Sequence, residues 1–306
     1  MTIAVASSPV SLGVTRASVG VVPALLPGER FLEEVRRAGF AGVELGPGDY
    51  LGVGSELVQR LVARDLGVSG AVLEFPFASA DAMTNSTPEL DAVLDSLDRL
   101  RDKVPGPVPR LTLVDAGDDR RRASPGVAHL GPDGHGLDER GWDRFAQRLD
   151  EVALHCRRRG FSTVLRPRVG SYVEAPGEID AVMRICDIGL GFDTGQVLIG
   201  GGDPVAMLRE WSDRVELVYL KDAIVSRMQD IIDGGEPAST VWSREVFCPL
   251  GDGDADCVGV LQQLQVMDFS GWLVVEQDAF ASTAERIAQG LDDQRRNRRF
   301  LSGQGL

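Results

Sequence analysis

Short apolar runs alternate with longer amphipathic segments along the 306-residue chain. Several runs are almost continuously apolar, which is typical of strands buried on both faces. The runs predict eight strands, over residues 3–6, 42–45, 68–74, 110–115, 162–166, 188–193, 215–221 and 272–276. Helical spacing of apolar positions predicts eight helices between them, over residues 29–38, 56–65, 89–103, 138–159, 178–186, 204–212, 256–267 and 283–301.

The helix predicted over 138–159 has the clearest periodicity. Its apolar face carries Trp142, Phe145, Leu149, Val152 and Cys156. Eight strands that alternate with helices over this length predict a (β/α)8 TIM barrel, as one domain spanning residues 1–306. A doubly wound parallel sheet is the alternative, but no Gly-x-Gly-x-x-Gly motif follows the first strand.

Two segments, 117–136 and 226–248, lack this periodicity and are predicted to be long loops. Loops of this length are often lids or binding loops, although plain surface insertions are equally consistent with the sequence. The first segment contains Arg120, Arg121 and Arg122. These arginines either recruit an anionic or polyhydroxylated ligand to a flap over the barrel mouth or form a solvated run of charge.

The net charge of the chain argues against two classes of binding partner. Asp and Glu number 46 against 32 Lys and Arg, which gives a formal net charge of −14. Neither nucleic acid nor an anionic membrane is expected as a partner, because both attract positive surfaces. The cysteines form no Cys-x-x-Cys pair, and no apolar stretch has the length of a signal peptide core or a membrane span. We expect a cytoplasmic protein with a small polar substrate; whether it forms a homo-oligomer stays open.

Ionisable side chains stand at the ends of seven successive predicted strands. In a TIM barrel, catalytic groups lie where the strands end and the following loops begin. A purely structural barrel has no need of such a ring, because buried charge is costly unless it is paired. Any single member of the ring could instead cap a helix or pair with a neighbour. The ring consists of Glu44, Glu74, Asp115, Arg166 with Arg168, Asp193, Lys221 with Asp222, and Glu276.

Five motifs follow one another along the chain: "AGFAGVELGPGDYLG" (38–52), "GFDTGQVLIGGGDP" (191–204), "RVELVYLKDA" (214–223), "VFCPLGDGDAD" (246–256) and "GWLVVEQD" (271–278). Together they resemble the xylose isomerase-like sugar phosphate isomerase/epimerase superfamily, and within it the myo-inosose (2-keto-myo-inositol) dehydratases. The resemblance implies a TIM barrel and a divalent ion, commonly manganese or cobalt, held by carboxylates and imidazoles. That ion polarises a ketone so that a carboxylate can remove an adjacent proton.

This chain keeps only part of the ligand set that the resemblance implies. Asp193 matches the aspartate of the family motif "DTGH", and Glu276 matches the glutamate of "VEQD". The expected histidines are replaced by Gln196, Tyr219, Arg166 and Arg168. The histidines that are present, His129, His135 and His155, all precede the predicted fifth strand.

These replacements change the chemistry of the site. Arginine cannot bind a metal, because its guanidinium stays protonated and offers no free lone pair. Tyrosine binds one only after losing a proton whose ordinary pKa is about 10. Two carboxylates without a metal repel each other, whereas a guanidinium can bind both. We therefore predict that Arg166, with Arg168 as a second candidate, replaces the cation between Asp193 and Glu276. The site is then expected to hold no metal or other cofactor.

Two classes of function follow. The first is a metal-independent or weakly metal-dependent isomerase, epimerase or dehydratase, which removes a proton next to the carbonyl of a sugar, cyclic polyol or related keto compound. Its catalytic candidates are Glu276 or Glu44 as base and Lys221 or Tyr219 as acid. Its substrate-binding candidates are Arg166, Arg168, Asp193, Gln196, Glu74 and Asp115. The second class is a non-catalytic ligand-binding protein or partner subunit. The polar strand ends favour the enzyme, because a structural role would fill them with apolar side chains.

Overall fold

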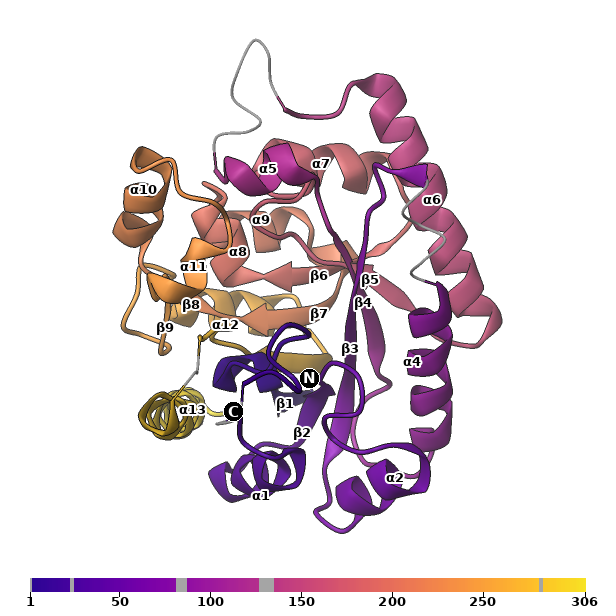
Figure 1. The fold of residues 1–306 in the computed structure, drawn as a ribbon, viewed down its shortest axis with the longest axis vertical. Coiled ribbons are helices and arrows are strands. Elements are labelled where there is room, and N and C mark those ends of the chain that lie inside the picture. Colours follow the sequence, from indigo (N-terminus) through magenta and orange to yellow (C-terminus); the bar gives the residue numbers. More distant parts are fainter. Residues whose placement is uncertain (1, 23–24, 81–86, 127–134, 281–282) are drawn as a thin grey trace.

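The computed structural model describes residues 2–22, 25–80, 87–126, 135–280 and 283–306. Eight parallel strands close into a barrel in the order β1-β10-β7-β6-β5-β4-β3-β2. Helices surround this barrel (Figure 1). The predicted (β/α)8 architecture is confirmed, and the doubly wound alternative is wrong because the sheet closes on itself.

Each barrel strand lies within one residue of its predicted bounds at either end. The strands are β1 Ile3–Ser7, β2 Gly42–Leu45, β3 Gly67–Phe75, β4 Arg110–Asp115, β5 Thr163–Leu165, β6 Gly189–Asp193, β7 Val215–Leu220 and β10 Gly271–Val275. The barrel is closed by pairing between β1 and β10, which runs in parallel register from Ile3 with Gly271 to Ser7 with Val275. All the strands therefore end at the same mouth.

The eight predicted helices are all present. They are α1 Gly28–Ala38, α2 Gly54–Val62, α4 Thr87–Leu100, α6 Glu139–Arg158, α7 Pro176–Ile185, α9 Pro204–Glu210, α12 Cys257–Val266 and α13 Ala284–Gly303. The face of α6 that the periodicity identifies is turned inward, with Phe145 and Leu149 buried. Short elements that the sequence did not predict are the 3-10 helices η1 Pro9–Leu12 and η2 Ser212–Arg214 and the helix α8 Thr194–Ile199.

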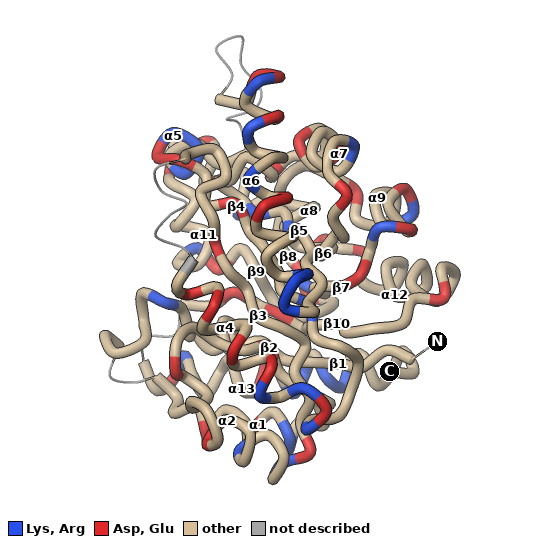
Figure 2. The backbone as a smooth tube through the Cα atoms, turned by 90° about the vertical axis from the view of Figure 1, so that its right-hand side faces the viewer, with Lys and Arg blue, Asp and Glu red and all other residues tan. Residues whose placement is uncertain are grey.

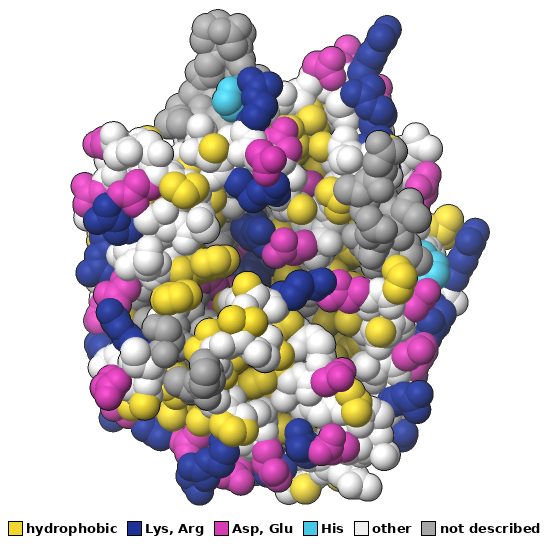
Figure 3. Space-filling model, in the orientation of Figure 1, with side chains coloured by type: hydrophobic (Ala, Val, Ile, Leu, Met, Phe, Trp, Pro, Cys, Tyr) yellow, Lys and Arg dark blue, Asp and Glu magenta, His cyan; other side chains and the backbone are white. Residues whose placement is uncertain are grey.

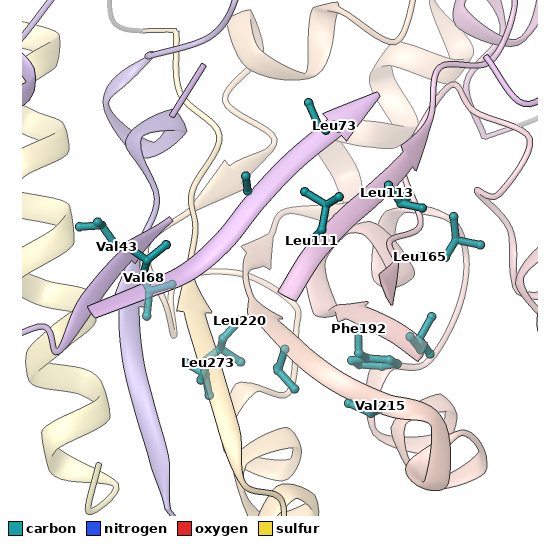
Figure 4. Packing of buried hydrophobic residues seen from close by; sticks show 14 of the residues in the cluster. Val43, Val68, Leu73, Leu111, Leu113, Leu165, Phe192, Val215, Leu220 and Leu273 are labelled. Carbon is teal, nitrogen blue, oxygen red and sulfur yellow. The ribbon is translucent and has the colours of Figure 1, made fainter. Parts of the chain in front are cut away.

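Side chains alternate between two layers of core along the strands. In β7, Val218 and Leu220 pack in the layer between strands and helices, part of which Figure 4 shows with Leu113, Leu220 and Leu273 labelled. Leu217 and Tyr219 belong instead to a separate cluster with Ala6, Val164, Trp272 and Val274. This second cluster fills the barrel, and Tyr219 therefore points into its interior.

Trp272, near the start of β10, closes the end of the barrel opposite the mouth. Its ring is buried, and its Nε1 donates a hydrogen bond to the Pro107 carbonyl over 2.9 Å. Gly42, Gly67 and Gly106 approach this ring so closely that a Cβ on any of them would lie within 2.8 Å of a ring atom. This end of the barrel is thus filled with apolar side chains.

The segment 226–248 is not the long loop that the sequence predicted. It contains the helices α10 Val225–Asp233 and α11 Thr240–Ser243, and the strand β9 Phe247–Cys248, which pairs antiparallel with β8 Asp222–Ala223. Met228, Ile231, Val241 and Phe247 belong to an apolar cluster of this region. The prediction failed because each helix is short and the intervening "DGGEP" (233–237) breaks the periodicity between them.

The segment 117–136 contains the short helix α5 Asp119–Ala123, and residues 127–134 of the predicted flap lie outside the described residues. Arg121 is fully buried, and it donates to Glu178 over 2.6 and 2.8 Å and to Glu174 over 3.2 Å. The prediction that Arg121 recruits a ligand is therefore wrong, because its charge is used to fix α5 against α7.

Lys and Arg positions alternate with Asp and Glu positions along the helices and loops of the backbone in Figure 2. None of the described helices combines the length and the apolar character needed to cross a bilayer.

Candidate active site

The charged residues at the strand ends converge at the mouth of the barrel. Asp193 is the last residue of β6, and Arg166, Lys221 and Glu276 directly follow β5, β7 and β10. None of the four is more than 7% exposed. Figure 3 shows a hollow near the centre of the face seen in Figure 1, where Lys and Arg side chains gather beside Asp and Glu. The barrel closure thus assembles a compact group of charges from strands far apart in sequence.

Arg166 lies between two carboxylates, as the sequence predicted. Its Nε and Nη2 donate to Asp193 Oδ2 over 2.8 and 2.5 Å. Nη2 also donates to Glu276 Oε1, and Nη1 lies 3.4 Å from Glu276 Oε2. The guanidinium carbon is 3.7 Å from the centroid of the Tyr219 ring, a cation–π contact. Arg166 is thereby held by contacts to three strand ends.

Lys221 adds a second cation to this network. Its Nζ lies 2.6 Å from Glu276 Oε1, 3.1 Å from Asp278 Oδ2 and 3.5 Å from Asp193 Oδ2. Burial lowers the pKa of Lys221, but the charges of Asp193, Asp278 and Glu276 outweigh burial and raise it. Lys221 therefore stays protonated, and two fixed positive charges stand among three carboxylates.

Glu44 forms a second hydrogen-bonded group beside the first. The Tyr219 hydroxyl donates to Glu44 Oε1 over 2.7 Å, and the Ser8 hydroxyl donates to Oε2 over 2.9 Å. The Tyr219 hydroxyl also lies 2.7 Å from Thr112 Oγ1 in β4. Burial and then the charge of Glu44 raise the pKa of Tyr219 well above its ordinary value. Tyr219 is therefore a neutral donor that positions Glu44.

The two buried glutamates have opposite pKa shifts. Burial raises the pKa of Glu44 to about 7, and the negative charge of Glu276 acts in the same direction. Burial also raises the pKa of Glu276, but Arg166 and Lys221 outweigh it and bring that pKa well below its usual range. Glu44 can therefore exchange a proton near neutral pH, while Glu276 stays ionised. Carboxyl groups driven apart in this way are typical of acid–base sites.

The family of the chain follows from the match to a known model. The model described as "Xylose isomerase-like TIM barrel" matches residues 32–297. The chain belongs to the xylose isomerase-like TIM barrel family.

Inosose dehydratases are among the relatives of this family member. The one from Geobacillus kaustophilus is 32% identical over 145 residues, which are 46% of this chain and 47% of that protein. The one from Bacillus velezensis is 25% identical over 267 residues, 86% of this chain and 85% of that protein. The rhizopine catabolism protein MocC of Rhizobium meliloti is 27% identical over 254 residues, 82% of this chain and 75% of MocC. The first of these matches thus spans about half the length of the relative.

Solved structures share the fold at low sequence identity. The probable 3-DHS dehydratase AsbF from Bacillus anthracis superposes with a TM-score of 0.71 at 9% identity, covering 98% of both chains. An L-ribulose 3-epimerase superposes with a TM-score of 0.65 at 16% identity, covering 99% of this chain and 94% of its own. At these identities the likeness concerns the fold alone.

The donor set of this family member does not fit the divalent ion that the resemblance implies. The Arg166 N–H groups fill the space between Asp193 and Glu276, and Lys221 places a second positive charge beside it. A divalent cation there would be repelled by both. No group of three or more His, Cys, Asp and Glu side chains in the described part of the chain could hold a metal ion. His155 contacts Asp91 over 2.8 Å between the outer helices, and His129 lies outside the described residues.

Two predicted substrate-binding residues contact backbone. Asp115 is buried and accepts hydrogen bonds from the backbone N–H groups of Phe77, Gly117 and Tyr172, over 3.3, 3.0 and 2.8 Å. Gln196 Oε1 accepts from the Val169 N–H over 2.8 Å. Both side chains hold loops at the mouth in place. Their role in substrate binding stays a prediction.

Arg168 does not share the cation's place with Arg166. It pairs with Glu74, because two residues beyond Arg166 the chain has already left β5 and turned into the loop above the buried network. The prediction that Arg168 helps to replace the cation is therefore wrong, and the second cation is Lys221. Asp222, the remaining member of the ring, accepts backbone N–H bonds from Gly251, Gly253 and Ala255 and orders that loop.

Three polar partners in the site were missed from the sequence. Asp278 lies two residues beyond Glu276 in the same motif, and Ser8 directly follows the first strand. Thr112 lies inside β4, between Leu111 and Leu113. A single polar side chain just beyond a strand or inside one is too common a signal to be singled out.

Proposed function

We propose that this protein is an enzyme of the isomerase, epimerase or dehydratase type that acts on a hydroxylated keto compound without a metal ion. The observation that carries this proposal is the guanidinium of Arg166 held between Asp193 and Glu276 at the barrel mouth, with Glu44 beside it. The inosose dehydratases among the relatives support a cyclic polyol ketone, or a closely similar compound, as substrate.

Glu44, Lys221 and Arg166 have different roles in the proposed reaction. The carboxylate of Glu44 accepts the proton from the carbon next to the carbonyl, and the electron pair moves onto the carbonyl oxygen. Lys221 and Arg166 stabilise the resulting oxyanion by hydrogen bonds and charge. In a dehydration, Glu44 gives this proton to a departing β-hydroxyl group, which leaves as water while the electron pair of the oxyanion re-forms the carbonyl. In an isomerisation, the proton of the hydroxyl group on the reacting carbon moves to the oxyanion, and Glu44 delivers its proton to the former carbonyl carbon. In an epimerisation, Glu44 releases its proton to solvent, and the opposite face of the reacting carbon takes up another.

The other candidates take supporting roles in this scheme. Glu276 has a pKa too low for an effective base near neutral pH, and it instead holds Arg166 and Lys221 in position. Tyr219, with its raised pKa, donates a hydrogen bond to Glu44 and gives up no proton.

Hydrogen exchange in D2O tests the proposal directly. With 2-keto-myo-inositol as substrate, NMR should show deuterium entering the carbon next to the carbonyl, at a rate that excess EDTA leaves unchanged. Glu44→Gln should abolish this exchange. Glu151→Gln, on the exposed face of α6, is the matched control and should retain it. Stoichiometric divalent metal that EDTA removes together with the activity would contradict metal independence.

A second candidate function is a non-catalytic ligand-binding protein. The observation that favours it is the saturation of the network, since Arg166, Asp193 and Glu276 are buried and already satisfy one another. Binding of a polyol ketone by calorimetry, without deuterium exchange in any such compound, would select this alternative.

A further inference from the structure

Above the buried network the mouth opens at Glu74, near the end of β3. Leu73 and Phe75 pack in the outer core, whereas Val72 packs against the cluster inside the barrel. Because strand side chains alternate, Glu74 stands on the inner side, at the level of the mouth. Its side chain is 51% exposed, in contrast to the buried Asp193. Solvent and ligands can therefore reach it.

Three arginines that follow three different strands act on this carboxylate. Arg168, after β5, pairs with Glu74 directly. Burial raises the pKa of Glu74, but Arg168 and then the more distant charges of Arg16, after β1, and Arg122, on α5, lower it on balance. Arg122 is held in place by a 2.8 Å hydrogen bond to the Ala116 carbonyl, at the end of β4. Hydrogen bonds thus place Arg168 and Arg122 on this side of the mouth, and Arg16 acts on Glu74 through its charge.

The three guanidinium groups are accessible, and their other partners hold them weakly. The side chains of Arg168, Arg122 and Arg16 are 32%, 48% and 69% exposed. Arg122 also pairs with Asp119, and Arg16 with Glu89, both on the molecular surface. Exposed pairs of this kind contribute little to stability and exchange readily. Each guanidinium thus has one carboxylate partner that an incoming oxyanion can displace, and arginine N–H groups suit oxyanions of either kind.

We propose that Arg16, Arg122 and Arg168 form an oxyanion-binding rim, and that the substrate carries a carboxylate or phosphate group which displaces Glu74 from Arg168. Without ligand, Glu74 keeps Arg168 extended and neutralises it. With ligand, the bidentate guanidinium geometry suits either oxyanion. The assignment of this ligand as substrate rests on the proposed function. It adds an anionic group to the hydroxylated keto compound proposed above, as in a keto acid or a phosphate ester, whose carbonyl reaches down to Lys221.

Calorimetric titration with inorganic phosphate, and separately with gluconate, tests the rim. Arg168→Gln, Arg122→Gln and Arg16→Gln should each weaken the affinity for the preferred anion about tenfold, the loss of one charge-assisted hydrogen bond. Glu74→Gln should strengthen binding about tenfold, because it removes the competing carboxylate. Arg244→Gln, an exposed arginine paired with Glu236 away from the mouth, should leave the affinity unchanged. The anion that binds more tightly then shows whether the substrate carries a phosphate ester or a carboxylate group.

Two results would overturn the rim: no saturable binding of either anion by the wild type and Glu74→Gln, or equal effects of the rim variants and Arg244→Gln. Deuterium exchange, measured in parallel, separates this outcome from the fate of the proposed function. If the rim variants change the anion affinity as predicted but no substrate exchanges deuterium, the rim is supported and the proposed enzyme function is wrong. If a substrate exchanges deuterium but neither anion binds, the rim is wrong and the proposed function stands.

Discussion

Replacing Arg166 with alanine should destabilise the fold substantially. The substitution leaves Asp193 and Glu276, both almost fully buried, without the guanidinium that donates to each of them. Removing one member of a buried ion pair typically costs about 3–5 kcal/mol, because the remaining charge loses its compensation. It also removes the cation–π contact with Tyr219 and leaves a cavity at the barrel mouth.

Lys221 limits this loss. Its Nζ lies 2.6 Å from Glu276 and 3.5 Å from Asp193, so neither carboxylate is left without a cation. We therefore expect a loss near the lower end of the range, about 3 kcal/mol. For a chain of this length, the usual unfolding entropy per residue converts that value into a fall in Tm of about 5 °C.

Urea denaturation at pH 7, followed by circular dichroism, measures the change. Arg244→Ala is the matched control, since its exposed pair with Glu236 should contribute little to stability. The loss caused by Arg166→Ala should shrink as the pH falls below about 4. Glu276 has a lowered pKa in the folded state, so its stabilising contribution is present above the unfolded pKa and is lost on acidification. A change no larger than the control's, or independent of pH, would refute the reasoning.

Three further predictions concern the same site. Tyr219→Phe keeps the ring beneath Arg166 but removes a donor to Glu44, so the pH profile of deuterium exchange should move to higher pH; an unmoved profile contradicts this. The free energy of unfolding should fall as the pH rises from 5 to 8, because burial raises the pKa of Glu44 to about 7 and of Asp115 to about 6 in the folded state. Glu44→Gln should reduce this slope, measured by urea denaturation at several pH values, by at most about 1.4 kcal/mol per pH unit. Arg166→His combined with Tyr219→His should bind manganese or cobalt more tightly than wild type by calorimetry; equal affinities would show that these two positions do not decide metal binding.

The barrel could be predicted from sequence because its signal is repeated eight times. Each strand is an apolar run with a clear end, and every barrel strand lies within one residue of its prediction. The insertion after β7 could not be predicted, since the "DGGEP" stretch breaks the periodicity between α10 and α11 and α11 has only four residues. Their stability depends on contacts such as those of Met228 and Phe247, which only the folded chain brings together.

The sequence predicted most of the residues that form the site, but not how deep each of them lies along the barrel axis. Position at a strand end identified Arg166, Asp193, Lys221 and Glu276, and charge balance indicated the contacts of Arg166. Sequence gave no measure of depth along the barrel axis. It therefore could not show that Arg168 pairs with Glu74 at the exposed mouth, nor that the carboxylate of Asp115 accepts hydrogen bonds from backbone N–H groups. It also could not rank Glu44 against Glu276, because their opposite pKa shifts depend on distances to Arg166 and Lys221.

Arg166 and Lys221 together supply two positive charges, the same formal charge as the divalent ion that the resemblance implies. The replacement differs from an ion in two physical respects. The charges are fixed to β5 and β7 by covalent bonds, so a chelator cannot remove them. In the proposed reaction they stabilise an oxyanion through N–H donors and charge, without a direct bond to the oxygen, which is a weaker polarisation than coordination by a metal. Such a site is suited to protons already made acidic by a neighbouring ketone, and Glu44, with a pKa about 7, is matched to remove them near neutral pH.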